Sequence, residues 1–214
     1  PYRVWFGAGA AQLARGAKAP VVIVSHGGEG SDGGFRTLQH YSVELARHGY
    51  VAINPGHRLS NPNTMADRTR DRPRDVRLLI DRLQANTLDM PEVLDPRRFP
   101  DRVDELNLGA MSHSYGAYTA SALAGATLQA NVGTPGAYTS FRDCRVRAVV
   151  MLSPQGPDQF GSWRARDTDL ANGPAGLNAC AGEPPVSTDN TWETITTPAL
   201  VMFGACEENG PADS

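Results

Sequence analysis

Five short apolar runs recur along the sequence, and their alternation with helical patterns constrains the fold more than any other feature. Each is the length of a strand buried on both faces of a sheet. The runs are VVIVSH (21–26), YVAIN (50–54), LNLGAMS (106–112), VRAVVML (146–152) and PALVMF (198–203). Because strands that alternate with helices form parallel sheets covered on both faces, we predict an α/β fold.

Helical patterns lie between these runs. Leu38, Tyr41 and Leu45 recur at helical spacing, and Gly49 is placed to end that helix. The clearest helix is predicted to start at Pro73, because a proline fits the first turn. Its apolar stripe consists of Val76, Leu79, Ile80 and Leu83. An alanine-rich helix is predicted from 115 to about 125.

The chain length favours one domain. With 214 residues, of which 40% are hydrophobic, a single domain over 1–214 is expected. Within it, residues 153–197 are rich in Gly, Pro, Asp and Asn and carry few apolar anchors. Loops of that length in compact domains are usually lids or binding loops. We therefore expect a lid-like or irregular insertion there.

Charge and cysteine content exclude several classes of partner. A net charge of -3 and a pI near 6.0 offer no basic field for phosphates, so nucleic acid is not an expected partner. No apolar run reaches the roughly 18 residues of a membrane span. The 3 cysteines are too scattered for a metal or redox motif, although one disulfide is possible. A small, neutral or weakly polar ligand fits better, and we expect neither a metal nor an organic cofactor.

The stretch around Ser114 has the context of a nucleophile elbow. An apolar run leads through S-H-S-Y-G (112–116) into a small-residue helix. Ser112 and Gly116 have a steric reason to be small, although glycine is commoner at the first of these positions. The turn would raise the Ser114 hydroxyl above the sheet, and the Tyr115 N–H would point to where an oxyanion forms. The alternative is a strand-to-helix turn with a chance serine.

The glycine-rich loop HGGEGSDGG (26–34) has three interpretations: a dinucleotide-binding loop, an oxyanion loop and a flexible turn. G-E-G-S-D-G matches a dinucleotide-binding pattern, but Glu29 and Asp32 would face the pyrophosphate, and no acid lies at 48–57 to hold a ribose. The favoured interpretation is an oxyanion loop whose Gly28 N–H joins that of Tyr115. The third is a flexible turn.

Several motifs together resemble a known family. These are SHGGEGSDGGF (25–35), ELARHGYVAINPGH (44–57), RPRDVRLLIDRL (72–83), SHSYGAYTA (112–120), RVRAVVMLSPQG (145–156) and TPALVMFG (197–204). In this order they resemble the predicted dienelactone hydrolase and platelet-activating-factor acetylhydrolase-like branch of the α/β-hydrolases. The resemblance implies the α/β-hydrolase fold, a nucleophile at Ser114, an oxyanion hole at Gly28 and Tyr115, and hydrolysis of carboxylic esters. True dienelactone hydrolase uses a cysteine at this position, so its substrate is not carried over.

The sequence offers two candidates for the acid of a catalytic triad and none for its base. The family order is Ser, Asp or Glu, then His, which makes Glu207 the first candidate for the acid and Asp158 the second. Every histidine precedes Ser114, and none suits the base: His26, His40, His48, His57 and His113. Relatives carry a further strand and a histidine loop after the acid. We therefore expect these residues to be a C-terminally incomplete hydrolase, nearly inert without its imidazole.

The sequence thus predicts a serine carboxylic-ester hydrolase that acts through an acyl-enzyme on small or medium esters. The alternative is an inactive hydrolase-fold binding module that lacks the triad histidine. A nicotinamide oxidoreductase is a distant third. Similar proteins are often exported by bacteria, which points only weakly to a secreted or periplasmic location.

Overall fold

The computed structural model of the protein describes residues 2–7, 18–28, 34–57, 65–91, 94, 103–129, 138–154 and 192–204. Within these residues, six strands form a central sheet in the order β1-β3-β2-β4-β7-β8. The strands are β1 (Tyr2–Trp5), β2 (Ala19–Ser25), β3 (Val51–Pro55), β4 (Val103–His113), β7 (Val146–Leu152) and β8 (Ala199–Met202). β1 is antiparallel to β3, and the other neighbours are parallel.

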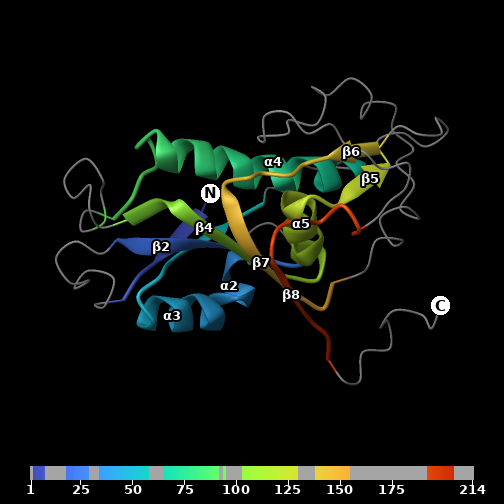
Figure 1. Ribbon diagram of the computed structural model, residues 1–214. Coiled ribbons are helices and arrows are strands. Elements are labelled where there is room, and N and C mark those ends of the chain that lie inside the picture. Colours follow the sequence, from blue (N-terminus) through green and yellow to red (C-terminus); the bar gives the residue numbers. More distant parts are fainter. Residues whose placement is uncertain are drawn as a thin grey trace.

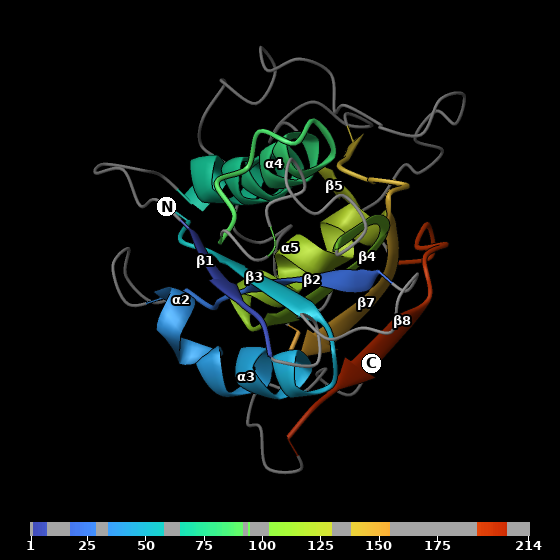
Figure 2. The same ribbon diagram turned by 90° about the vertical axis from the view of Figure 1, so that its left-hand side faces the viewer.

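Helices cover both faces of this sheet. α4 (Met65–Gln84) and α5 (Tyr115–Ala124) lie on one side, and α2 (Gly34–Thr37) and α3 (Gln39–Arg47) lie on the other (Figure 1 and Figure 2). A small antiparallel pair, β5 (Thr127–Gln129) and β6 (Tyr138–Ser140), stands apart from the main sheet. The predicted α/β fold is confirmed. No helix in the described part of the chain is long and apolar enough to cross a membrane.

Two apolar clusters hold the layers together, because successive side chains of a strand point to opposite faces. Val21 and Ile23 of β2 join the main core, which includes Val76 and Ile80 of α4. Val24 faces the other side, where it joins a smaller cluster with Leu38 and Ala52. The predicted strands therefore lie where their apolar runs are. β2 and β3 are buried between the two helical layers, whereas β8 is exposed along its length at the end of the described sheet.

The predicted helices lie at the expected positions in the sequence, but the start of one of them is wrong. α3 is followed by Gly49 at φ 88°, and α5 ends at Gly125 with φ 117°, as the sequence indicated. α4, however, begins at Met65, and Pro73 lies inside it, so the predicted start is wrong. A proline removes one backbone hydrogen bond, but the preceding MADRTRDR contains good helix formers that continue the helix N-terminally.

Some sequence predictions fall on residues that the structure does not describe. Of the predicted lid-like insertion, residues 155–191 lie outside the described ranges, so the lid stays a prediction. Cys144, which follows β6, is disulfide-bonded, and its partner also lies outside those ranges.

Candidate active site

The carboxyl ends of β2, β3 and β4 meet at one edge of the sheet, where ligand sites of open α/β sheets usually form. β2 lies between the other two strands and runs parallel to both, with Ser25 in register with Ser112. The residues that follow the three strands are therefore neighbours: the glycine loop after β2, His57 after β3, and Ser114 after β4.

Ser114 occupies the sharp turn between β4 and α5. Its backbone has φ 52° and ψ -121°, a left-handed conformation that few residues other than glycine adopt. The Ser114 N–H donates to Leu152 O of β7 at 2.9 Å, and the Ser114 carbonyl accepts the N–H of Ala117 at 2.8 Å to begin the helix. The turn is thus held from both sides, and Ser114 stays partly exposed.

Gly116 lets the helix approach the sheet closely. A Cβ atom at this position would clash with the carbonyl oxygen of Ser25 and would lie 2.6 Å from that of His26. Ser112, two residues before Ser114, is fully buried. The steric reason for small residues on both sides of Ser114 therefore applies most strongly at Gly116.

Gly27 and Gly28, at the start of the glycine loop, lie directly beside this turn. A Cβ atom on Gly27 would lie 3.5 Å from the Cβ of Ser114, and one on Gly28 would lie 4.0 Å from the Cβ of Tyr115. The structure therefore brings together Ser114, Tyr115 and Gly28, which the sequence analysis had placed in one site.

Arg72 of α4 reaches under the glycine loop, and the sequence analysis had not assigned it a role. Its guanidinium is buried, with 2% of the residue exposed, and donates to His26 O at 2.6 Å and to Gly27 O at 2.7 Å. The same guanidinium lies 4.5 Å from the centre of the Tyr115 ring, within cation–π distance. Arg72 thus contacts both the loop and the residue that follows Ser114.

A second hydrogen-bonded group lies at the ends of β2 and β3 and includes Asp75 of α4. His57 Nε2 is 2.7 Å from Ser25 Oγ, and His57 Nδ1 is 2.9 Å from Asp75 Oδ2. Burial lowers the pKa of His57, and the nearby Arg72 cation lowers that pKa further, so the ring is neutral. The Nδ1–H group then donates a hydrogen bond to the Asp75 carboxylate, and Nε2 accepts a hydrogen bond from the Ser25 hydroxyl.

This group has the hydrogen bonds of a Ser-His-Asp triad but lacks the access that catalysis requires. Ser25 lies in the sheet and is 1% exposed. No ester carbonyl can reach its hydroxyl without displacing the backbone around it. We therefore interpret Ser25, His57 and Asp75 as a buried support for the end of β2.

His26 is also buried and neutral. Burial, followed by the Arg72 cation, lowers the pKa of His26 to about 3. Its Nδ1–H donates to Gly27 O at 2.9 Å, so this carbonyl accepts from His26 and Arg72 together. The ring packs against the backbone of Gly34, where a Cβ atom would clash with it. His26, the first residue of the loop, is therefore held by Arg72 at its carbonyl, by Gly27 O at its ring and by the backbone of Gly34.

The structure leaves the acid and the base of the predicted triad unplaced. Glu207 and Asp158 lie outside the described residues. In the described part of the chain, none of the five histidines hydrogen-bonds to the Ser114 hydroxyl. His26, His48 and His57 are bonded to other groups, and His40 lies with its ring against Tyr41.

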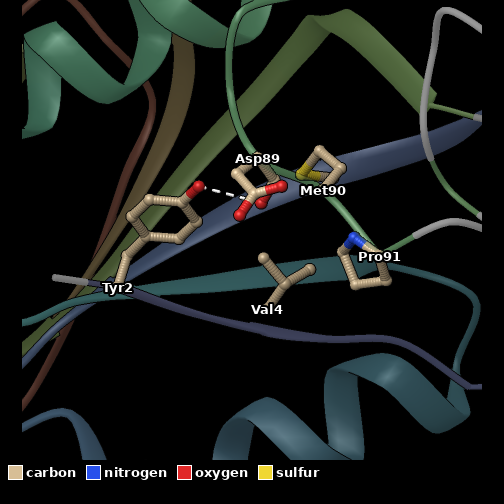
Figure 3. Close-up of a pocket in the computed structure, with 5 residues that line it drawn as sticks. All are labelled: Tyr2, Val4, Asp89, Met90 and Pro91. Carbon is tan, nitrogen blue, oxygen red and sulfur yellow. Dashed lines mark hydrogen bonds between the residues drawn. The ribbon is translucent and has the colours of Figure 1, made fainter.

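A cavity of about 470 Å³ lies elsewhere, at the outer edge of the sheet. Tyr2, Val4, Asp89, Met90 and Pro91 line it, and the Tyr2 hydroxyl donates to Asp89 O at 2.8 Å (Figure 3). This site offers one carboxylate and no nucleophile with a base beside it, so it is not a candidate for the catalysis that the sequence predicts. Among the described residues, no group of three or more His, Cys, Asp and Glu side chains could hold a metal ion.

Comparison with known proteins identifies the fold. No protein-family model and no curated protein matches the sequence. The butyrate-bound structure of esterase 2 from the planctomycete Thermogutta terrifontis matches with a TM-score of 0.53 and 12% identity, over 95% of this chain and 77% of that chain. The same esterase phosphorylated by paraoxon matches with a TM-score of 0.52 and 12% identity, over 95% and 76% of the two chains.

At this identity the likeness is one of fold. The chain has an α/β fold with a mostly parallel sheet, of the kind that these esterases also have. The comparisons do not test the assignment to the dienelactone hydrolase branch, which stays a prediction.

Proposed function

We propose that the protein is a serine hydrolase of carboxylic esters, with Ser114 as its nucleophile. The observation that supports this most is the backbone of Ser114, a non-glycine residue at φ 52° on a strand-to-helix turn that faces the glycine loop. Strain of this kind costs about 1–3 kcal/mol and is concentrated at functional sites. The similarity in fold to an esterase adds coarse support.

In the proposed mechanism the Ser114 oxygen attacks the ester carbonyl and forms a tetrahedral intermediate. The N–H groups of Gly28 and Tyr115 donate to its oxyanion. An imidazole accepts the serine proton and returns it to the leaving alcohol, which yields an acyl-enzyme that water then hydrolyses. We propose Glu207 as the carboxylate that orients the imidazole, with Asp158 as the alternative. The substrate class is small or medium esters.

A fluorophosphonate probe applied to the full-length protein tests this proposal. We expect one covalent adduct per chain, mapped to Ser114 by peptide mass spectrometry, and none in Ser114→Ala. Ser25→Ala is the matched control, because Ser25 has triad-like hydrogen bonds but is buried. Absence of labelling in the wild type, or equal labelling of Ser114→Ala, would refute the proposal. An adduct that mass spectrometry maps to Ser25 in the wild type, and that is absent from Ser25→Ala, would transfer the role to Ser25.

A binding module without turnover is the second candidate. It is favoured by one observation: in the described residues, no histidine hydrogen-bonds to Ser114. It predicts that an unreactive ester analogue binds to the full-length protein, while short-chain p-nitrophenyl esters are not hydrolysed above the rate of Ser114→Ala.

A further inference from the structure

We propose that Arg72 is the positioning residue of the oxyanion hole, because it fixes the directions of the amide N–H groups in the glycine loop. The inference rests on the proposed function, since it assigns a role within the same site. Arg72 does not touch the substrate in this scheme. It acts through the backbone of the loop and through Tyr115.

The first step follows from the planarity of the peptide bond. In a trans peptide the carbonyl of one residue and the N–H of the next point in opposite directions. Arg72 binds the carbonyls of His26 and Gly27. The N–H groups of Gly27 and Gly28 must therefore point away from the buried guanidinium. Glycines without such an anchor turn their peptide planes easily, because glycine tolerates most backbone angles.

The second step concerns the direction in which the loop faces. Gly27 lies beside Ser114, and Gly28 lies beside Tyr115, at the Cβ separations of 3.5 and 4.0 Å given above. The guanidinium also stacks over the Tyr115 ring. One side chain thus contacts Tyr115 and the carbonyl of the Gly27–Gly28 peptide, whose N–H is the other proposed donor of the hole. A rigid pair of donors is what distinguishes an oxyanion hole from a flexible loop.

The third step is the choice of side chain. Two consecutive carbonyls and an aromatic face match a planar fork of donors, which arginine has and lysine lacks. The groups around Arg72 are arranged to accept a buried cation. Burial and the Arg72 cation lower the pKa of both His26 and His57, so neither ring adds a positive charge beside the guanidinium. The Ser25–His57–Asp75 group supports the same end of the loop from the last residue of β2.

Arg72→Lys in the full-length protein is the variant that tests this role. Lysine keeps the positive charge but lacks the planar pair of N–H donors that binds both carbonyls. We expect kcat for a p-nitrophenyl ester to fall about 10- to 100-fold with KM changed less than about 2-fold, since removal of one oxyanion donor costs about 10²–10³ in kcat. Amide hydrogen exchange at Gly27 and Gly28 should accelerate. The control is Arg82→Lys, an exposed arginine on the same helix, which should change neither quantity.

The two readouts separate this inference from the proposed function. If Arg72→Lys keeps wild-type kcat and wild-type exchange at the loop, the positioning role is overturned. A rise in KM of about 10- to 100-fold with kcat unchanged would also overturn the positioning role. If Ser114→Ala remains active, the proposed function fails, while faster exchange in Arg72→Lys still establishes that Arg72 orders the loop. Arg72→Met leaves two buried carbonyls without these bonds and is expected to unfold more easily, so Arg72→Lys carries the test.

Discussion

Substitution of Gly116 by alanine is expected to destabilise the protein, because α5 approaches the end of β2 too closely there to leave room for a methyl group. A Cβ atom there would lie 2.6 Å from His26 O and 2.8 Å from the carbonyl carbon of Ser25. Both are backbone atoms at the end of β2, and neither can rotate away. Ordinary contacts between such atoms need about 3.5 Å, so α5 or the strand must move by about 1 Å.

The energetic cost follows from that displacement. Overpacking by one methyl group typically costs about 1–3 kcal/mol, and we expect Gly116→Ala near the upper end, because backbone opposes the new atom. For a chain of this size that corresponds to a fall in Tm of about 2–4 °C per kcal/mol. The shift also displaces the carbonyls of Ser25 and His26, so labelling of Ser114 should slow.

Gly109→Ala is the matched control. This glycine lies in β4, and its Cβ would meet Ala148 O at 3.6 Å and Val22 Cγ2 at 3.8 Å, both ordinary contacts. We expect a change of less than about 1 kcal/mol, on the stabilising side, because alanine restricts the unfolded chain. Urea unfolding followed by circular dichroism measures both variants. Equal midpoints for Gly116→Ala and Gly109→Ala would show that the close approach of α5 does not limit this position.

Two further expectations concern buried charge. Arg145 donates to the fully buried Asp143 through Nε at 2.8 Å and through Nη2 at 2.6 Å, so Arg145→Met should lower the free energy of unfolding by about 3 kcal/mol. The exposed Arg147→Met should change it by less than about 0.5 kcal/mol, and equal losses in urea titrations would contradict this. Because the pKa of His26 is lowered to about 3, the unfolded chain binds a proton that the folded chain refuses. Stability should therefore fall by about 1.4 kcal/mol per pH unit as the pH drops from about 6.5 towards 3. His26→Asn should flatten that slope in urea titrations at several pH values, whereas a slope changed equally by His40→Asn would point to another group.

Much of the fold could be predicted because the strands signal themselves locally. The run at 146–152 matches β7 residue for residue, since apolar side chains other than Arg147 fill this largely buried strand. β1 gives no such signal, because it is a four-residue edge strand with one exposed and three partly buried residues. Its pairing with β3 is decided by tertiary contact. The start of α4 was missed for the opposite reason, since a proline signal was given too much weight.

The candidate site divides in the same way. The turn at Ser114 was predictable because strand, small residues and helix follow one another directly in the sequence. Arg72 was not, because its partners His26 and Gly27 lie 46 and 45 residues away in the chain. From the sequence alone, the R-P-R-D stretch at 72–75 indicates only a helix start and part of a family resemblance. The hydrogen bonds from Arg72 to the carbonyls of His26 and Gly27 depend on the packing of α4 against this loop, which is a tertiary contact.

The strained turn at Ser114 has a consequence for anyone who evolves this protein in the laboratory. A selection for heat resistance alone rewards any change that relaxes a costly backbone angle, and glycine at position 114 would do so. Such a campaign would discard the hydroxyl while it improved the scaffold. Libraries built for durability should therefore keep this codon fixed and look for gains in other parts of the chain.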